Sequence, residues 1–89
     1  VEIEVTNIEE FNDALAGRPD IIMLDNMNSR EVKACVEIRR LAKFRPFLEV
    51  SGGITLDNIE EYAKTKVDMI SVGSLTASVN SIDMSLEVI

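Results

Sequence analysis

Ser51, Gly52 and Gly53 are the residues of this chain best suited to holding an anion. They come directly after the predicted strand 47–50 and precede a segment whose apolar residues have helical spacing. Glycine allows the backbone to approach a ligand closely and to point its N–H groups outward. A following helix adds the positive end of its dipole. We therefore predict a phosphate-binding turn here, and an ordinary tight turn is the alternative interpretation.

A second turn of the same kind follows one strand–helix unit later. Gly73 and Ser74 come at the end of the apolar segment 67–72, and a helix is again expected to follow them. Because the carboxyl ends of parallel strands meet at one edge of a sheet, the two turns are expected to lie side by side. Two such turns form the phosphate-binding loops of a (β/α) barrel. The two turns together therefore favour the interpretation that the chain binds a phosphorylated ligand.

Two acidic residues, Glu4 and Asp25, lie at or near the ends of other predicted strands at the same edge. Alternation turns Glu4 to the face opposite Ile3 and Val5, which is the lumen in a barrel whose outside is covered by helices. A carboxylate there loses hydration unless a cation or a hydrogen-bond donor meets it. Glu4 and Asp25 could hold Mg²⁺ or accept hydrogen bonds from sugar hydroxyls. A surface strand position for Glu4 and a simple turn at Asp25 are the alternatives.

A repeat of strands and helices would bring these residues to one edge. Apolar alternation or continuous apolar runs predict strands over 1–5, 20–25, 47–50 and 67–72. Such a repeat forms a parallel sheet with right-handed crossovers. Four strands do not close an eight-stranded barrel, so we expect the C-terminal half of an α/β (TIM-like) barrel. A free-standing flavodoxin-like sheet is the competing architecture.

Helix signals occupy the segments between these strands. Asn7, Ser29 and Thr55 are the predicted N-caps, and Thr55 is followed by Asn58 as half of a capping box. A helical turn is expected over 76–81. The inner face of the third predicted helix comprises Leu56, Ile59 and Ala63.

Length and composition restrict the class of protein. Eighty-nine residues make one domain at most, and the chain begins at Val1 inside a predicted strand. We expect residues 1–89 to be a single domain from the barrel of a longer chain. The net charge of −7 argues against nucleic-acid binding, the absence of histidine excludes histidine-based chemistry within these residues, and no apolar run could span a membrane. The single cysteine, Cys35, fits a buried thiol in a cytoplasmic protein.

The ordered set of motifs resembles the quinolinate phosphoribosyltransferase family, also called carboxylating nicotinate-nucleotide pyrophosphorylases. The segments that carry the resemblance are EIEV (2–5), IMLDNM (22–27), EVSGGIT (49–55), VDMISVGSLT (67–76) and IDMSL (82–86). Each motif alone is generic, whereas the set in this order and spacing is specific. The resemblance implies an incomplete α/β barrel joined to an N-terminal sandwich domain, a homodimer, and Mg²⁺ as the cofactor.

The resemblance also implies the reaction and the roles of the site residues. Family members convert quinolinate and 5-phosphoribosyl 1-pyrophosphate to nicotinate mononucleotide, pyrophosphate and CO₂ in NAD biosynthesis. Glu4 and Asp25 match the acidic pair near the ribose hydroxyls and the metal. The residues that match the loops binding the 5′-phosphate are Ser51, Gly52, Gly53, Gly73 and Ser74.

Two departures from the family pattern limit what these residues can do. Ala77 stands where members often have histidine, which leaves backbone N–H groups and Ser78 as candidates in the last loop. The Arg and Lys cluster that holds the carboxylates of quinolinate is absent from this segment. The alternative functions are another barrel enzyme that binds a phosphorylated sugar, or a non-catalytic half-barrel module that associates with itself.

Overall fold

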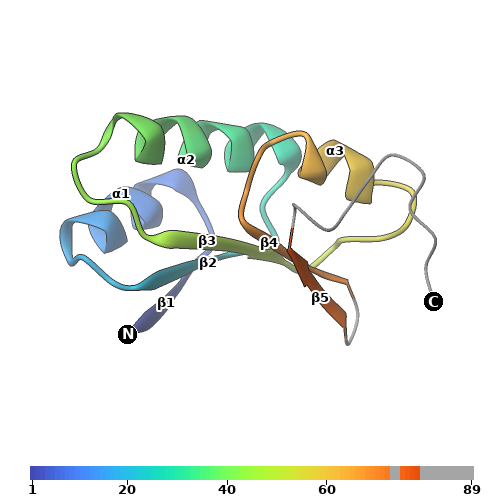
Figure 1. Cartoon of the computed structure of the whole chain (residues 1–89), viewed down its shortest axis with the longest axis horizontal. Helices are drawn as coiled ribbons and strands as arrows, with labels where there is room; N and C mark the ends of the chain where they lie inside the picture. The colour runs from blue at the N-terminus through green and yellow to red at the C-terminus, as the bar shows by residue number, and fades with distance from the viewer. Residues whose placement is uncertain (73–74, 79–89) are drawn as a thin grey trace.

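The computed structural model describes residues 1–72 and 75–78, which form one sheet with its helices on one side (Figure 1). The elements in chain order are β1 (Glu2–Val5), α1 (Ile8–Ala16), β2 (Ile21–Asp25), α2 (Ser29–Leu41), β3 (Phe47–Ser51), α3 (Ile59–Ala63), β4 (Met69–Val72) and β5 (Leu75–Ser78). Strands β1 to β4 are parallel neighbours in sequence order, and β5 is antiparallel to β4. The predicted parallel α/β architecture is confirmed.

The helix side of the sheet carries the hydrophobic core. Ile22 on β2 is in register with Leu48 on β3, and both are fully buried, as is Ile70 on β4. Phe11 from α1 and Val32 from α2 are buried against the same cluster. Continuous burial on this side explains why the strands are rich in apolar residues, because the crossover helices cover that face along the whole strand length.

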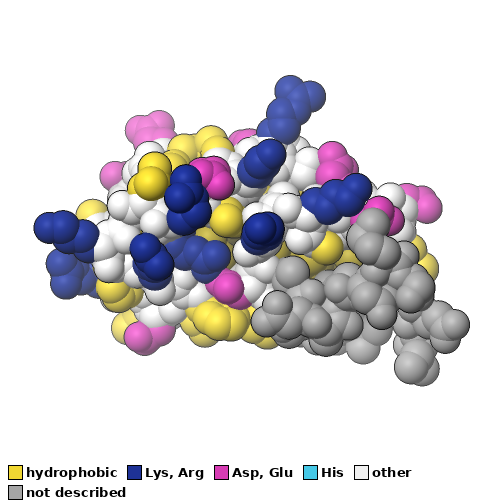
Figure 2. All heavy atoms as spheres, turned by 45° about the horizontal axis from the view of Figure 1, so that its top comes forward, with side chains coloured by type: hydrophobic (Ala, Val, Ile, Leu, Met, Phe, Trp, Pro, Cys, Tyr) yellow, Lys and Arg dark blue, Asp and Glu magenta, His cyan; other side chains and the backbone are white. Residues whose placement is uncertain are grey.

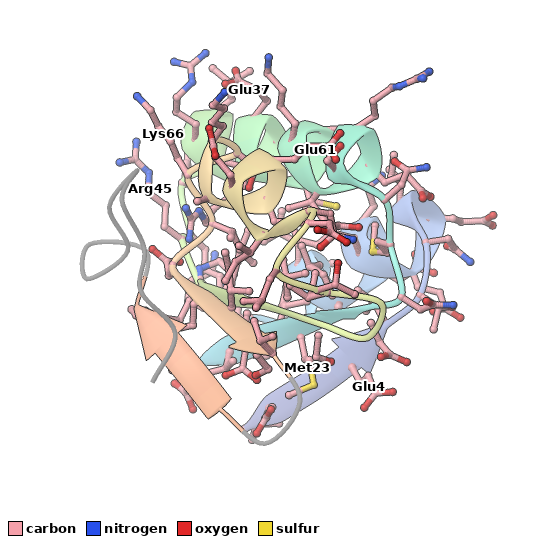
Figure 3. All side chains as sticks on the ribbon, turned by 90° about the vertical axis from the view of Figure 1, so that its right-hand side faces the viewer. Glu4, Met23, Glu37, Arg45, Glu61 and Lys66 are labelled. Carbon is pink, nitrogen blue, oxygen red and sulfur yellow. The ribbon has the colours of Figure 1, made fainter. Side chains whose placement is uncertain are left out.

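The other side of the sheet has no described helix over it. Glu4, Met23, Glu49 and Met69 form one row across β1 to β4 on this open face, and each is exposed or half-buried. Figure 3 shows Glu4 and Met23 on the side of the sheet away from the helices. The prediction that Glu4 points away from Ile3 and Val5 is therefore confirmed, and this face is the one that a closed barrel would turn to its lumen.

Helix α2 begins one residue earlier than the predicted cap implied. The side chain of Asn28 accepts a hydrogen bond from the Glu31 N–H at 2.9 Å, and Glu31 Oε1 accepts from the Asn28 N–H at 3.2 Å. This complete capping box makes Asn28 the N-cap and Ser29 the first helical residue, so the prediction for Ser29 is wrong. The Asn7 cap of α1 is confirmed by its side-chain bond to the Glu10 N–H.

The third helix is shorter than predicted. Residues 56–58 form a turn, and α3 begins only at Ile59. Leu56 is therefore 58% exposed instead of lying on an inner helix face. The prediction of Thr55 as the N-cap is wrong, because Asn58 is the residue that precedes α3. Asn58 Oδ1 nevertheless accepts a hydrogen bond from the Thr55 N–H at 2.7 Å. The bond closes the turn that precedes α3.

The parallel repeat ends after β4. Residues 75–78 pair with β4 in antiparallel register, from Val72 opposite Leu75 to Met69 opposite Ser78. The helical turn predicted over 76–81 is wrong for residues 76–78, and its remainder lies outside the described residues. An unpaired strand edge leaves a row of backbone N–H and C=O groups without partners, and β5 satisfies that edge of β4. No described helix is long and apolar enough to span a membrane.

An ion pair ties α2 to the amino end of the sheet. The Arg39 guanidinium pairs with the Asp68 carboxylate just before β4 and also donates to the Pro46 carbonyl at 3.2 Å. Asp68 in turn accepts from the Leu48 N–H at 2.8 Å. Removal of either charged partner would leave the other half-buried, with only a backbone hydrogen bond to compensate its charge. The contact fixes β3 and β4 relative to each other at the end opposite the predicted site.

Cys35 is fully buried on α2, as its helical position predicted. Burial in the apolar core, with a smaller contribution from the Glu31 carboxylate, raises the pKa of its thiol to about 12. The thiolate is the nucleophilic form of cysteine, so this side chain is inert in the folded protein.

We expect Cys35 in the native parent chain to resist alkylation. At about pH 8 the raised pKa lowers the thiolate fraction by about a thousandfold relative to the unfolded chain, and burial slows access further. Peptide mapping by mass spectrometry after iodoacetamide treatment, with and without urea, measures this difference. Similar labelling of Cys35 in both conditions would show that the core around α2 opens readily.

Candidate functional site

The carboxyl ends of β2 and β3 bring Asp25 and Ser51 together. They are direct partners in the parallel register and are both half-buried on the open face. The Ser51 hydroxyl donates to Asp25 Oδ1 at 3.4 Å, and the Asn26 N–H donates to the Ser51 carbonyl at 2.8 Å. No ion pair within the described part of the chain involves Asp25. Its carboxylate is therefore available to an external cation or hydroxyl group.

The close approach of the chain to Asp25 requires glycine at position 52. Its φ of +79° lies in the region that only glycine adopts without strain. A Cβ atom at this position would lie 2.9 Å from Asp25 Oδ1, closer than real Cβ contacts allow, and 3.1 Å from the Asn26 nitrogen, which is a tight contact. The turn therefore packs directly against the carboxylate, which a larger residue would displace.

Gly53 and Asn26 complete this close approach. Gly53 also has a positive φ, +75°, but its Cβ would meet only Asn26 Oδ1 at 3.4 Å. Asn26 itself has a φ of 55°, a conformation that asparagine tolerates better than most residues. From the sequence alone, Asn26 is interpreted only as part of a simple turn that follows β2 at Asp25. Its role in shaping the site follows from its contact with both glycines.

The turn contains three consecutive backbone N–H groups, two at exposed glycines and the third at the buried Ile54. Among the described residues no acceptor is bonded to the N–H groups of Gly52, Gly53 or Ile54. Gly52 and Gly53 are exposed, so their donors are open to an anion. Successive N–H groups in a glycine-rich turn suit a phosphate group, which has several acceptor oxygens. Ser51, Gly52 and Gly53 thus form a turn with unbonded N–H groups, and phosphate binding by it remains a prediction.

The helix-dipole part of the prediction is wrong. Helix α3 has five residues and starts at Ile59, after the turn at 56–58. A short helix this far from Gly53 contributes little field to the turn, because the effect is confined to the first turn of a helix. Any anion held here depends on the backbone N–H groups of residues 52–54.

The second predicted turn, at Gly73 and Ser74, lies outside the described residues. The element that follows it is the strand β5 instead of the expected helix. The predicted turn is flanked by Val72 of β4 and Leu75 of β5, which are partners in the antiparallel register. Its contribution to phosphate binding remains a prediction.

Glu4 lies on the same face as Asp25 but at a different level. It is exposed on β1 and faces Met23 in the register, two residues before Asp25 on β2. Within residues 1–72 and 75–78 no group of three or more Asp, Glu or Cys residues is placed to hold a metal ion. The two carboxylates therefore form part of a coordination shell at most, and a ligand would have to supply the rest.

The open face carries acidic and no basic side chains among the described strand residues. Its charged members are Glu2, Glu4, Asp25 and Glu49. Figure 2, in which the helix side turns toward the viewer, shows Lys and Arg side chains spread over that opposite surface. An anionic ligand on the open face therefore meets repulsion from the carboxylates, and only the backbone donors or a bound cation can offset it.

Comparison with known proteins places these features in a family. Residues 1–87 match the family model of the quinolinate phosphoribosyl transferase C-terminal domain. The chain is 50% identical over 93 residues to a Methanocaldococcus jannaschii protein named "Probable nicotinate-nucleotide pyrophosphorylase (carboxylating)", which covers 100% of this chain and 33% of that protein. It is 38% identical over 86 residues to the Mycobacterium leprae nicotinate-nucleotide pyrophosphorylase (carboxylating), with 97% and 30% covered.

A solved structure shares the fold. The nicotinate-nucleotide pyrophosphorylase from Francisella tularensis superposes with a TM-score of 0.73 and 47% identity, over 83% of this chain and 26% of that one. The family resemblance found in the motifs is confirmed. The chain spans only 26 to 33% of the length of these relatives.

We expect Gly52→Ala to destabilise the parent chain more than the matched variant Gly53→Ala. Both substitutions force a side chain into positive φ, which costs about 1 kcal/mol. Only Gly52→Ala adds a collision with the Asp25 carboxylate, so its total loss should reach about 2 kcal/mol. Urea denaturation of the two variants measures the difference. Equal losses would mean that the loop moves away from Asp25 without cost.

Proposed function

Because the chain belongs to the family of the quinolinate phosphoribosyl transferase C-terminal domain, we propose that it carries the ribose-phosphate half of a quinolinate phosphoribosyltransferase active site. The proposed reaction transfers the phosphoribosyl group of 5-phosphoribosyl 1-pyrophosphate to quinolinate with loss of CO₂. Its products are nicotinate mononucleotide, pyrophosphate and CO₂, and the pathway is NAD biosynthesis. The supporting observation is that Asp25, Ser51 and three unbonded backbone N–H groups meet at one edge of the sheet.

The turn after β3 is proposed to bind the 5′-phosphate. The N–H groups of Gly52, Gly53 and Ile54 are the donors, and glycine at the first two positions keeps side chains out of the way. Gly73 and Ser74 are proposed to add further donors. This arrangement fixes one end of the substrate, so the reacting carbon of the ribose is held at a constant distance from Asp25.

Asp25 is proposed to act on the ribose. Its position is fixed by the Ser51 hydroxyl on one side and by Gly52 on the other. A carboxylate held in this way can accept hydrogen bonds from the ribose hydroxyls and stabilise positive charge that develops on the sugar as the pyrophosphate leaves. Because its surroundings are already ordered, little reorganisation is needed when the charge forms. Glu4 is proposed to assist from β1.

Mg²⁺ fits the donor set of the open face. Carboxylates from β1 and β2 are hard oxygen ligands, and Mg²⁺ is commonly held by one or two of them together with substrate phosphates. When bound, the ion would neutralise charge on the pyrophosphate leaving group. Asp25 and Glu4 are the residues proposed to hold it. The acidic open face gives this proposal its physical reason, because a pyrophosphate would otherwise be repelled there.

The quinolinate half of the site is proposed to come from elsewhere in the parent protein. The described strands place no Lys or Arg on the open face, yet two carboxylates of quinolinate require cationic partners. We propose that the remaining barrel strands and the N-terminal domain of a neighbouring subunit in a homodimer supply them. A cytoplasmic location is consistent with this metabolic role.

We expect Asp25→Asn in the parent enzyme to lower kcat by at least about a hundredfold. The substitution removes the charge while keeping an oxygen that can accept the Ser51 hydrogen bond, so the fold should persist. Steady-state kinetics with both substrates, together with a thermal melt, measures the effect. Asp13→Asn, at an exposed position on α1, is the control and should leave kcat unchanged. Near-normal kcat in folded Asp25→Asn would restrict Asp25 to a structural role.

A further inference from the structure

We propose that Asn58 is a positioning residue that holds the backbone donors of the phosphate-binding turn in place. The inference rests on the proposed function of residues 52–54 and extends it to a side chain outside the turn. Asn58 lies just before α3 and is half-buried. It was expected only to complete a helix cap, but its contacts reach back to the glycines.

The side chain of Asn58 bridges the peptide groups on both sides of Ile54. Its Nδ2 donates to the Gly53 carbonyl at 2.9 Å, and its Oδ1 accepts from the Thr55 N–H at 2.7 Å. One planar amide group thus satisfies an acceptor and a donor of the same loop. An assignment of Nδ2 and Oδ1 in the reverse sense would place donor against donor at Thr55, so the orientation is chemically fixed.

This bridge determines where the Ile54 N–H points. The described residues contain no cis peptide bond, so the Gly53–Ile54 peptide is planar and trans. In a trans peptide the carbonyl and the N–H point in opposite directions. Since Asn58 holds the Gly53 carbonyl, the Ile54 N–H must point away from Asn58. Asn58 thus sets the direction of this donor without bonding to it.

The phosphate-binding turn needs such a restraint because it contains two successive glycines. Gly52 and Gly53 have the widest conformational freedom of any residues, and without a restraint they would sample many orientations of their peptide groups. Binding phosphate would then have to order them, and that entropy loss lowers affinity. A preordered loop avoids this loss.

Asn58 is itself well anchored. Its backbone N–H donates to the Thr55 carbonyl at 3.2 Å, and its own carbonyl accepts from the Tyr62 N–H at 3.3 Å. The Tyr62 hydroxyl donates to the Met27 carbonyl at 2.8 Å in a buried position. The restraint on the turn therefore extends through α3 to Met27, two residues after Asp25 at the end of β2. Phosphate donors and ribose carboxylate are held in one connected structure.

The test is Asn58→Ala in the full-length parent enzyme. We expect KM for 5-phosphoribosyl 1-pyrophosphate to rise about tenfold, whereas KM for quinolinate should change less than about twofold. Asn28→Ala is the matched control, because it removes a comparable side-chain cap from α2 but touches no residue of the turn. Both variants should lose similar thermal stability, and only Asn58→Ala should show the selective KM effect.

A second variant covers the case in which Asn58→Ala does not fold. Asn58→Asp keeps the acceptor for the Thr55 N–H and loses the donor to the Gly53 carbonyl, so it should retain stability and still raise KM. Leu56→Asp, at an exposed position in the same turn, controls for the added negative charge. A greater KM rise in Asn58→Asp than in Leu56→Asp supports the role of the Gly53 bond, and an equal rise would overturn it.

The outcomes separate the two levels of the proposal. If the wild-type parent transfers phosphoribosyl groups and folded Asn58→Ala has unchanged KM values, the role of Asn58 is overturned while the proposed function stands. A selective rise that also occurs in Asn28→Ala would likewise overturn it, because general loss of stability would then be the cause. If the wild-type parent shows no such transfer, the proposed function fails and the role of Asn58 fails with it.

Discussion

The contact between Gly52 and the Asp25 carboxylate is the constraint on which the site depends. It exists because β2 and β3 are parallel and in register, so that Asp25 lies beside Ser51 and the next residue must turn across it. Any residue larger than glycine would collide with the carboxylate. The same turn leaves its N–H groups unbonded, so one local geometry yields both a fixed acid and a set of anion donors.

The one-sided sheet explains how an acidic chain could bind an anionic substrate. Helices cover the face that carries Ile22 and Leu48, and the Lys and Arg side chains lie over those helices (Figure 2). The other face is left with carboxylates and half-buried apolar residues such as Met23. Exposed apolar surface of this kind marks a face that further protein or a ligand covers. Under the proposed function, the backbone donors would bind the phosphate and the carboxylates would hold the metal, which agrees with this separation of charge.

The sequence predicted the fold where local pattern and tertiary structure agree. Strand alternation placed Glu4 on the open face, and the parallel order of β1 to β4 followed from the strand–helix repeat. The pattern failed where the outcome depends on distant partners. Strand β5 forms because β4 would otherwise have an unpaired edge, and no periodicity in residues 75–78 signals that pairing. The predicted start of α3 was too early, because the hydrogen bonds that Asn58 makes in the preceding turn compete with helix formation.

For the candidate site too, features that depend on residue type were predicted, and features that depend on long-range geometry were missed. Glycine after a strand was enough to predict a turn with exposed donors, because only glycine accepts positive φ without strain. It could not reveal that Gly52 lies against Asp25, since this contact depends on the register of two strands separated by α2. Nor could it reveal Asn58, because threonine followed three residues later by asparagine is also the pattern of an ordinary cap. The residues that do chemistry can thus be recognised from their types, whereas the residues that position them become evident only when long-range contacts are known.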